Sequence, residues 1–428
     1  MKVLKFGGSS VGSPERILEV KKIVEKQDEN CIVVVSAFQG VTDQLVEICR
    51  QAPLHNNIYQ EQFRQLCDRH KDVVKSLIAE NRRETVLRTL TELLQDLEDV
   101  LHGLFLLRDL TPKTSDYILS FGERLSALII SNVIENVSYA DPGEFIRTDS
   151  AFGKAKVDFN LTDGLISKHF AHPSKCTIIP GFIGRNAQGE TTTLGRGGSD
   201  YTAAIIAAAL DASVLEIWTD VDGFMTADPK KVEKAFAIRN LSYSEAMELS
   251  HFGAKVVYTP TIQPVFKKNI PVKVLNSFNP DAPGTVICSS DLNHTDSPIK
   301  GISSIDNISL ITLVGAGLVG VTGISSRLFS SLAKNSVNVI LITQASSEYS
   351  ITFAVNPADT RKAIKAIKNE FEAEIDYKKE ITILLEENLS IIAIVGEKMK
   401  NTPGISANLF TSLGRSGISV IATAQGSS

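Results

Sequence analysis

The chain has 428 residues, of which 43% are hydrophobic and 22% are charged, a composition that supports two or three globular domains. Its formal net charge of −5 argues against a protein that binds nucleic acid or an anionic membrane, because both partners call for a basic face. No apolar run is long enough to span a bilayer, and the first ten residues carry no secretory signal.

Short β-branched runs alternate with helix-like segments through the first 288 residues. The runs are continuously apolar, which is typical of strands buried on both faces; they cover residues 3–6, 31–36, 177–183, 215–218, 272–275 and 285–288. Residues 41–102 contain no glycine and have leucines at helical spacing, so we predict a block of helices there. This alternation predicts an α/β fold with a mostly parallel sheet covered on both sides.

The first predicted strand runs into a glycine turn, Lys5-Phe6-Gly7-Gly8-Ser9, ahead of a helix that Ser13 can cap. Backbone N–H groups in such a turn can approach an anion closely, and Lys5 adds a point charge suited to phosphate. A tight strand-to-helix turn with a surface lysine would have the same sequence. The spacing GxxxxGK[ST] is missing, so this is not a Walker-type nucleotide site.

A second glycine-rich stretch, TTTLGRGGSDYTA at residues 191–203, leads into an alanine-rich helix. We expect Ser199 or Asp200 to cap this helix, and Arg196 offers a bidentate fork for a carboxylate or phosphate. The alternative is glycine for close helix–sheet packing plus an ordinary cap. After the strand at 215–218, Thr219 and Asp220 could hold a ribose hydroxyl or Mg²⁺.

The C-terminal third is an internal repeat. Residues 314–347 align without gaps on residues 395–428, and fourteen of 34 positions are identical. Each copy is predicted to form a strand, a loop, an amphipathic helix and a second strand, which makes this part a pair of small αβ modules. An alternating strand follows the first copy at residues 348–355. The second copy reaches Ser428 before its counterpart, so we expect the natural polypeptide to continue or another segment to pair with the open edge.

Three further features predict no site by themselves. Residues 315–320 fit GxGxxG, but the other copy of the repeat lacks the pattern and no acidic residue follows about 20 positions on, so a dinucleotide site is rejected. The segments FGERLS (121–126) and FGAKV (252–256) hold charges that suit a solvated helix face. Five scattered cysteines without CxxC spacing favour a reducing cytoplasm over a disulfide scaffold or a cysteine zinc site.

Taken together, KFGGSSV, FGERLS, TTLGRGGSDYTAA, WTDVDG and FGAKV resemble the aspartate kinases of the amino-acid kinase family, over nearly the whole chain. The repeat resembles their paired ACT modules. Its sequence is most similar to the aspartokinase portion of the threonine-sensitive bifunctional aspartokinase–homoserine dehydrogenases. The resemblance implies a mostly parallel sheet sandwiched by helices, followed by two α+β ACT modules. It implies a catalytic domain over residues 1–288 with a helical insertion at about 41–110, a linker at 289–303, and tandem ACT domains at 304–428, the second one truncated.

The resemblance also implies a role for each motif residue. Lys5 and Asp200 would form the catalytic pair. The substrate would be held by Thr42, Glu123, Arg196 and Ser199. The nucleotide and its transferring phosphate would meet Lys5, Gly7, Gly8, Ser9, Thr219, Asp220, Lys230 and Lys255. An amino-acid effector would meet Gln344 and Gln425 in the two ACT modules. Mg²⁺ would arrive with ATP rather than on dedicated protein ligands.

The implied activity is ATP-dependent phosphorylation of the side-chain carboxylate of L-aspartate, the first step of the aspartate-family amino-acid pathway. Feedback by threonine and a homodimer or tetramer formed through the ACT modules are implied as well. Phosphoryl transfer to a carboxylate brings two anions together, so the site needs positive charge and oriented N–H groups. Lys5, two glycine turns and Arg196 meet that need.

Two alternatives remain at this point: another amino-acid kinase of the same fold, and a non-catalytic ACT-type amino-acid sensor. The ACT tail favours an aspartate kinase over other kinases of the family, and the presence of Lys5, Arg196 and Asp200 favours an enzyme over a sensor. Met225, Lys230 and Tyr258 depart from the residues that the family usually has there.

Overall fold

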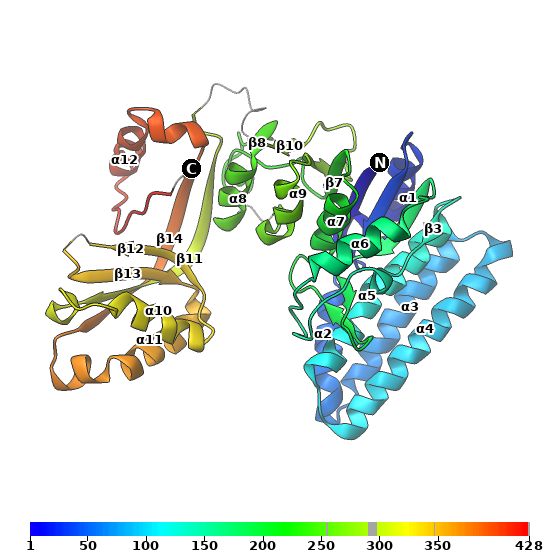
Figure 1. The fold of residues 1–428 in the computed structure, drawn as a ribbon, viewed down its shortest axis with the longest axis horizontal. Coiled ribbons are helices and arrows are strands. Elements are labelled where there is room, and N and C mark those ends of the chain that lie inside the picture. The colour runs from blue at the N-terminus through cyan, green and yellow to red at the C-terminus, as the bar shows by residue number, and fades with distance from the viewer. Residues whose placement is uncertain (254–255, 290–297, 346, 427–428) are drawn as a thin grey trace. The chain divides into compact units, whose positions relative to one another are not determined.

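The computed structural model describes residues 1–253, 256–289, 298–345 and 347–426. It divides into two compact units (Figure 1). The N-terminal unit is built from Met1–Pro229, Lys234–Ser250 and Lys255–Thr295, and the C-terminal unit from Lys230–Glu233, His251–Ala254 and Asp296–Ser428. None of the described helices is long and apolar enough to cross a membrane.

An eight-stranded sheet forms the centre of the N-terminal unit, in the order β3-β4-β2-β1-β7-β9-β10-β8. Its strands are β1 (Lys2–Phe6), β2 (Cys31–Val35), β3 (Ser138–Tyr139), β4 (Cys176–Pro180), β7 (Val214–Thr219), β8 (Asn240–Ser242), β9 (Val272–Asn276) and β10 (Thr285–Cys288). A separate hairpin pairs β5 (Ile183–Arg185) with β6 (Thr191–Thr193). The helices of the unit are α1 (Pro14–Glu25), α2 (Val41–Gln51), α3 (Ile58–Leu77), α4 (Glu80–Leu107), α5 (Pro112–Val133), α6 (Phe159–His169), α7 (Gly198–Ala209), α8 (Tyr243–His251) and α9 (Gln263–Lys267).

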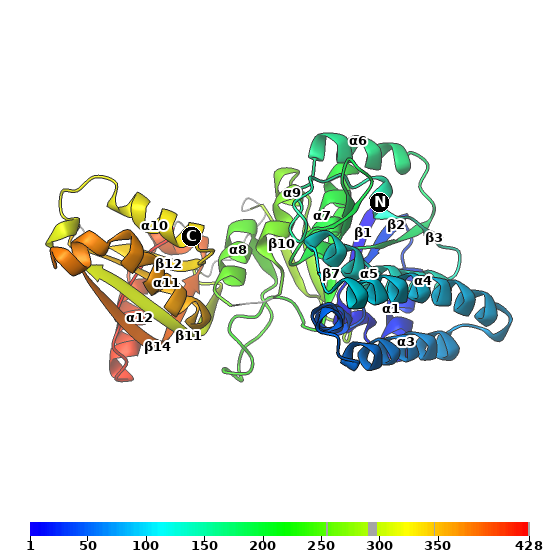
Figure 2. The same cartoon turned by 90° about the horizontal axis from the view of Figure 1, so that it is seen from below.

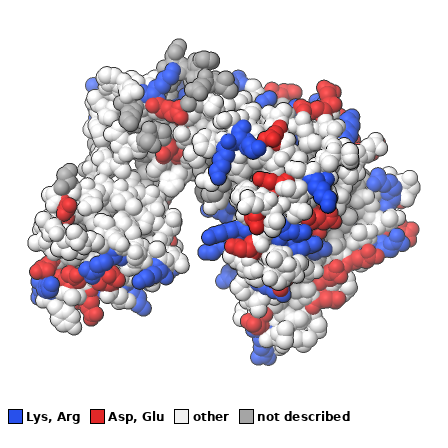
Figure 3. Space-filling model, viewed as in Figure 1, with Lys and Arg blue, Asp and Glu red and all other residues white. Residues whose placement is uncertain are grey.

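The sheet is mostly parallel, as predicted. Strand β1 pairs in parallel with β2 and β7, whereas β10 runs antiparallel to β9. Every residue of β2 is buried, because helices cover both faces of the sheet. Figure 2 shows α6, α7 and α9 on one face and α1, α3, α4 and α5 on the other. On the side shown in Figure 3, basic and acidic side chains of this unit are interspersed.

The glycine-free segment forms the predicted block of helices. Helices α2, α3 and α4 fill residues 41–107, and α4 buries its leucine stripe in the core that it shares with α3 and α5. The stripe consists of Leu90, Leu94, Leu97, Leu101 and Leu104.

Helix α1 begins as predicted, since the Ser13 hydroxyl accepts a hydrogen bond from the Arg16 N–H and Pro14 takes the first helical position.

The C-terminal unit holds a four-stranded antiparallel sheet in the order β12-β13-β11-β14. Its elements are β11 (Gly301–Val314), α10 (Ile324–Lys334), β12 (Val339–Gln344), β13 (Ser350–Val355), α11 (Pro357–Glu370), β14 (Thr382–Val395) and α12 (Ile405–Arg415). Strands β11 and β14 are equivalent in the repeat and pair with each other, from Gly301 opposite Val395 to Val314 opposite Thr382. The two copies are therefore related by a local two-fold axis between these strands.

The glycine shared by both copies directly after the long strand has a steric cause. A Cβ added at Gly315 would lie 1.9 Å from the carbonyl oxygen of Glu380, and one at Gly396 would lie 2.1 Å from that of Pro298. No side chain fits at either position without moving the backbone of the neighbouring segment. The repeated Val-Gly thus marks two equivalent close contacts between chain segments.

The second strand predicted for the second copy is not formed. Residues 418–426 follow α12 without helix or strand, whereas the equivalent part of the first copy is β12. Strand β12 exists as the neighbour of β13, which bonds to it from Val355 to Ile351. Among the strands that the structure describes, none pairs with residues 418–426, so this segment lacks the hydrogen-bonding neighbour that β13 gives to β12.

Two glycines in helices of the N-terminal unit allow a matched test of packing. A Cβ at Gly122 of α5 would lie 2.8 Å from the Cβ of Ala37, whereas a Cβ at Gly103 of α4 would meet no described atom within 4 Å apart from the nearby backbone of its own helix. We expect Gly122→Ala to lower the free energy of unfolding by about 1–3 kcal/mol through overpacking. Gly103→Ala should raise it by roughly 0.5–1 kcal/mol, because alanine is the better helix former. Urea unfolding of both variants measures the difference, and equal effects would contradict this packing.

Candidate active site

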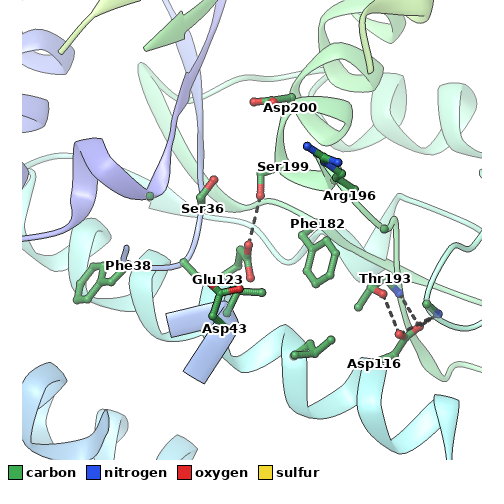
Figure 4. Close-up of a pocket in the computed structure, with 18 of the residues that line it drawn as sticks. Ser36, Phe38, Asp43, Asp116, Glu123, Phe182, Thr193, Arg196, Ser199 and Asp200 are labelled. Atoms are coloured by element: carbon green, nitrogen blue, oxygen red, sulfur yellow. Dashed lines mark hydrogen bonds between the residues drawn. The ribbon is translucent and has the colours of Figure 1, made fainter. Parts of the chain in front are cut away.

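A cavity of about 620 Å³ lies at the carboxyl ends of the central parallel strands (Figure 4). Its wall combines the turn after β1, residues 36–40 after β2, one face of α5, and the stretch from β6 into α7. Parallel α/β sheets bind ligands at this edge, because the loops there converge from several strands. The cavity brings together seven residues that the sequence analysis assigned to a site: Lys5, Gly8, Thr42, Glu123, Arg196, Ser199 and Asp200.

An ion pair joins the two glycine-rich stretches. The Lys5 Nζ lies 2.5 Å from Asp200 Oδ1, which links β1 to the first turn of α7. Lys5 is only 8% exposed, and a buried ammonium is stable only when it has a charged or hydrogen-bonding partner. The pair therefore places one positive charge in the cavity wall and fixes its position with a carboxylate.

Glu123 of α5 is a second charged group in the wall, only 4% exposed. Its Oε1 accepts a hydrogen bond of 3.3 Å from the Ser199 hydroxyl, and its Oε2 has no hydrogen-bond partner among the described residues. Burial raises the pKa of Glu123 to about 7, although the Ala37 N–H, Ser199 and Lys5 favour the charged form. The cavity wall thus holds a buried carboxyl group, and one of its oxygens has no partner within the part of the chain that the structure describes.

Glycines bring the two stretches close to each other and to the strands. A Cβ at Gly181 would lie 2.5 Å from the Cβ of Ser199, so only glycine lets α7 start next to the end of β4. Helix α7 begins after Gly197, whose φ of 71° is in the left-handed region. Ser199 and Asp200 therefore lie inside the first turn, not at the cap as expected. Their side chains contact Glu123 and Lys5 instead.

Asp116 is a buried carboxylate that the sequence analysis missed. It lies on α5 seven residues before Glu123, and therefore on the same helix face. Its oxygens accept hydrogen bonds of 2.8–2.9 Å from the N–H and hydroxyl of Thr193 and the N–H of Gly153. Burial raises the pKa of Asp116 above its usual value, although these hydrogen bonds favour the charged form. Asp116 anchors β6 to α5 beside the cavity.

Two phenylalanines that line the cavity also escaped the sequence analysis. Phe182 follows Gly181 with a φ of 71°, an uncommon conformation for a residue with a side chain, and its N–H donates to the Thr202 hydroxyl at 2.9 Å. Phe38 follows β2. Apolar residues in loops give no periodic signal, so nothing in the sequence marked them.

Of the residues assigned to the nucleotide, Lys5 and Gly8 line this cavity, and the others that the structure describes do not. Gly7 donates its N–H to the carbonyl of Trp218 at 3.1 Å, so the glycine turn contacts the end of β7, where Thr219 and Asp220 follow. Ser9 lies in the short 3₁₀ turn Gly8–Val11. Lys230 is exposed and groups with the C-terminal unit. Lys255 lies outside the described residues.

The residues assigned to an effector lie in the C-terminal unit. Gln344 ends β12 and lines a cavity of about 220 Å³ at the start of α10. Glu348 lines it too, and its Oε2 accepts the Gly320 N–H at 3.2 Å. Gln425 is exposed in the segment after α12 that forms no strand. Among the described residues, no group of three or more His, Cys, Asp or Glu side chains could hold a metal ion.

Family comparison agrees with this geometry. The family model described as amino acid kinase family matches residues 1–276, and an ACT domain model matches residues 311–371 and 392–428. The chain belongs to the amino acid kinase family. Its C-terminal unit carries the ACT region, and the mostly parallel sheet with helices on both faces is the fold that the sequence analysis expected.

Relatives over the full chain are aspartokinases. The chain is 36% identical over 437 residues to bifunctional aspartokinase/homoserine dehydrogenase 1 of Arabidopsis thaliana, with 100% of this chain and 48% of the relative covered. It is 31% identical over 442 residues to aspartokinase 1 of the same plant, with coverage of 100% and 75%. The chain thus spans about half the length of the bifunctional relatives that it matches.

Solved structures of aspartokinase III from Escherichia coli resemble the whole chain. The complex with aspartate and ADP has a TM-score of 0.82 at 27% identity, and the complex with lysine and aspartate has 0.79 at 28%. Each comparison covers 100% of this chain and 94% of the other. The fold of an aspartokinase therefore extends over both units.

The burial of Glu123 predicts a measurable effect on stability. Between its ordinary pKa of 4.5 and its raised value of about 7, the folded protein holds a proton that the unfolded chain has released, so stability falls as pH rises. Glu123→Gln removes this loss. Its free energy of unfolding should rise relative to the native protein by about 1.4 kcal/mol for each pH unit within that window, and stay constant above it.

Urea unfolding at several pH values from 4.5 to 8.5 measures this difference. Glu19→Gln on the exposed face of α1 serves as the control and should run parallel to the native protein. Parallel curves for Glu123→Gln as well would show that the carboxyl group is not desolvated.

Proposed function

We propose that this chain transfers the γ-phosphoryl group of ATP to the side-chain carboxylate of L-aspartate and forms aspartyl β-phosphate. The observation that carries the proposal is that buried Lys5, its ion-pair partner Asp200 and buried Glu123 line one cavity at the strand ends. Phosphoryl transfer between anions requires fixed positive charge, and an amino-acid substrate requires a separate carboxylate for its ammonium. Full-length relatives that are named aspartokinases support this choice of substrate.

The substrate's two charged ends find complementary partners in the wall. The unpartnered Oε2 of Glu123 is suited to the α-ammonium, and binding of that cation would drive the raised pKa of Glu123 down again. Arg196 is exposed at the start of α7, where its fork can take the α-carboxylate. Thr42 and Ser199 add hydroxyl groups to the same cavity wall.

In the proposed step, a side-chain carboxylate oxygen of aspartate attacks the γ-phosphorus. An oxygen–phosphorus bond forms, the bond to the β,γ-bridging oxygen breaks, and ADP keeps that electron pair. Lys5 neutralises charge on the transferred group, and Asp200 holds the Lys5 ammonium in place. Mg²⁺ bound to ATP would neutralise further phosphate charge.

The nucleotide is proposed to lie along the ends of β1 and β7. Gly7, Gly8 and Ser9 offer backbone and hydroxyl groups to the phosphates, and Lys5 lies between them and the substrate. Thr219 and Asp220, with Lys230 and Lys255, are proposed to contact the rest of the nucleotide. The second candidate is another amino-acid kinase activity, because the same phosphate-binding residues would serve a different amino-acid substrate equally well.

The effector is proposed to be threonine, bound in the ACT unit. The 220 Å³ cavity suits a small amino acid, since the start of α10 can face a carboxylate while Glu348 faces an ammonium and Gln344 a side-chain hydroxyl. We further propose assembly into a homodimer or tetramer through the ACT sheets and, from the scattered cysteines, a cytoplasmic location.

Trapping the acyl phosphate with hydroxylamine tests the activity. The native protein should form aspartyl hydroxamate from ATP and aspartate. Lys5→Ala and Asp200→Asn should lower kcat by at least about 10²-fold, because each removes a charge that acts on the transition state. Lys22→Ala, an exposed lysine of α1, is the control and should keep full activity. Turnover with glutamate but not aspartate would favour the second candidate.

Titration of the kinase reaction with amino acids tests the effector. Threonine should inhibit, and Gln344→Ala should raise the inhibitory concentration about tenfold without changing kcat, since one hydrogen bond contributes about 1–1.5 kcal/mol. Gln425→Ala compares the second module, whose segment is exposed. Inhibition by lysine and not by threonine would refute the choice of effector.

A further inference from the structure

Helix α3 of the helical block reaches two loops at the cavity through one side chain. The Arg69 Nη1 donates a hydrogen bond of 2.8 Å to the carbonyl of Gln39, and its Nη2 donates one of 2.9 Å to the carbonyl of Gly12. Gln39 belongs to the loop after β2, and Gly12 ends the glycine turn after β1. A single planar guanidinium therefore bridges the loops that follow two neighbouring strands.

The next residue on the same helix supports the same loop. The ring of His70 stacks on the ring of Phe38 at 4.9 Å between centroids and 6° between planes, and Phe38 lines the cavity. His70 is fully buried, and burial lowers its pKa to about 4, so the ring is an uncharged surface at neutral pH. The Arg69 guanidinium carbon lies 5.9 Å from the centre of the Phe38 ring.

These contacts continue to the groups assigned to substrate and phosphate. Ala37, two residues before Gln39, packs on α5 next to Glu123: a Cβ added at Gly122 would lie 2.8 Å from the Ala37 Cβ. The two loops also touch each other: a Cβ at Gly8 would lie 3.1 Å from the Ala37 carbonyl oxygen, and a Cβ at Gly12 would lie 3.1 Å from the Gln39 Cβ. A shift of Gln39 is therefore transmitted to Glu123 on one side and to the glycine turn on the other.

Arg69 itself does not line the cavity. Its two bonds end on backbone carbonyls, and carbonyls in loops have no strand or helix partner to fix them. We propose that Arg69 is a positioning residue for phosphoryl transfer. It fixes the distance between the glycine turn and the loop 36–40, and thereby the position of Lys5 relative to Glu123. This inference rests on the proposed function and assigns the helical block a part in it.

The side chain requires two donors in one plane, which gives the test its form. Arg69→Met should lower kcat/KM by about 10- to 100-fold and raise KM for both ATP and aspartate, because the loops lose their common support. Arg69→Lys should recover only part of this, since one ammonium lacks the planar fork. Arg64→Met is the control: Arg64 lies on α3, is exposed and pairs with Glu61 at 2.9 Å, so its loss should change nothing.

Chemical rescue separates positioning from a general loss of stability. In Arg69→Gly, guanidinium ion at low millimolar concentration should restore a substantial part of the activity, whereas urea, which has similar shape but no charge, should not. Amide hydrogen exchange in residues 8–12 and 36–40 should become faster in Arg69→Met than in the native protein, with no change in β4 or α7.

The outcomes distinguish the two proposals. Two results would overturn the role of Arg69. One is that Arg69→Met keeps the native KM values. The other is that activity is lost, guanidinium does not restore it, and hydrogen exchange in both loops stays slow. A native protein that forms no aspartyl hydroxamate would overturn the proposed function. Hydrogen exchange would then still report whether Arg69 holds the two loops.

Discussion

The kinase region depends on keeping one ammonium group buried at the end of its central strand. Lys5 lies on β1, which has a neighbouring strand on each side and helices on both faces, so water cannot solvate its charge freely. Asp200 supplies the counter-charge, and it can do so only because glycines let α7 begin within contact distance of β4. The requirement for one buried cation thus explains two glycine-rich stretches that are almost 200 residues apart.

The carboxyl groups around this cation are treated differently by their surroundings. Asp200 faces an ammonium, and Asp116 is saturated by hydrogen bonds to β6 and to the 149–155 loop, whereas Glu123 keeps an oxygen without a partner. The desolvation of Glu123 is therefore compensated least, and this raises the pKa of its carboxyl group. No described residue satisfies that oxygen, and a buried carboxyl group with a raised pKa in a cavity is the pattern expected of a binding position.

Much of this could be predicted from the sequence, because the decisive signals are local. Continuous apolar runs, a long segment without glycine, and a glycine turn next to a capping residue are read from neighbouring positions. They predicted the sheet, the helices and the start of α1, whereas the cap expected for α7 was wrong. Asp116 and Arg69 could not be found this way, since an isolated charge in a helical pattern looks the same whether it meets water or a distant backbone group. The strand predicted after α12 was wrong for the same reason, because a local pattern cannot tell whether a strand has a neighbour to pair with.

The ladder between β11 and β14 makes the duplicated ACT region one cooperative body. Strand β14 pairs with β11 from Thr382 to Val395, with register shifts between Ile305 and Leu310, and β11 lies between β14 and β13 in the sheet. The second copy is therefore held to the sheet by its pairing with the first, and β11 is the central strand, or spine, that both copies share. Any ligand that bends or slides this spine acts on both halves at once, so two sequence-related modules would report a single signal.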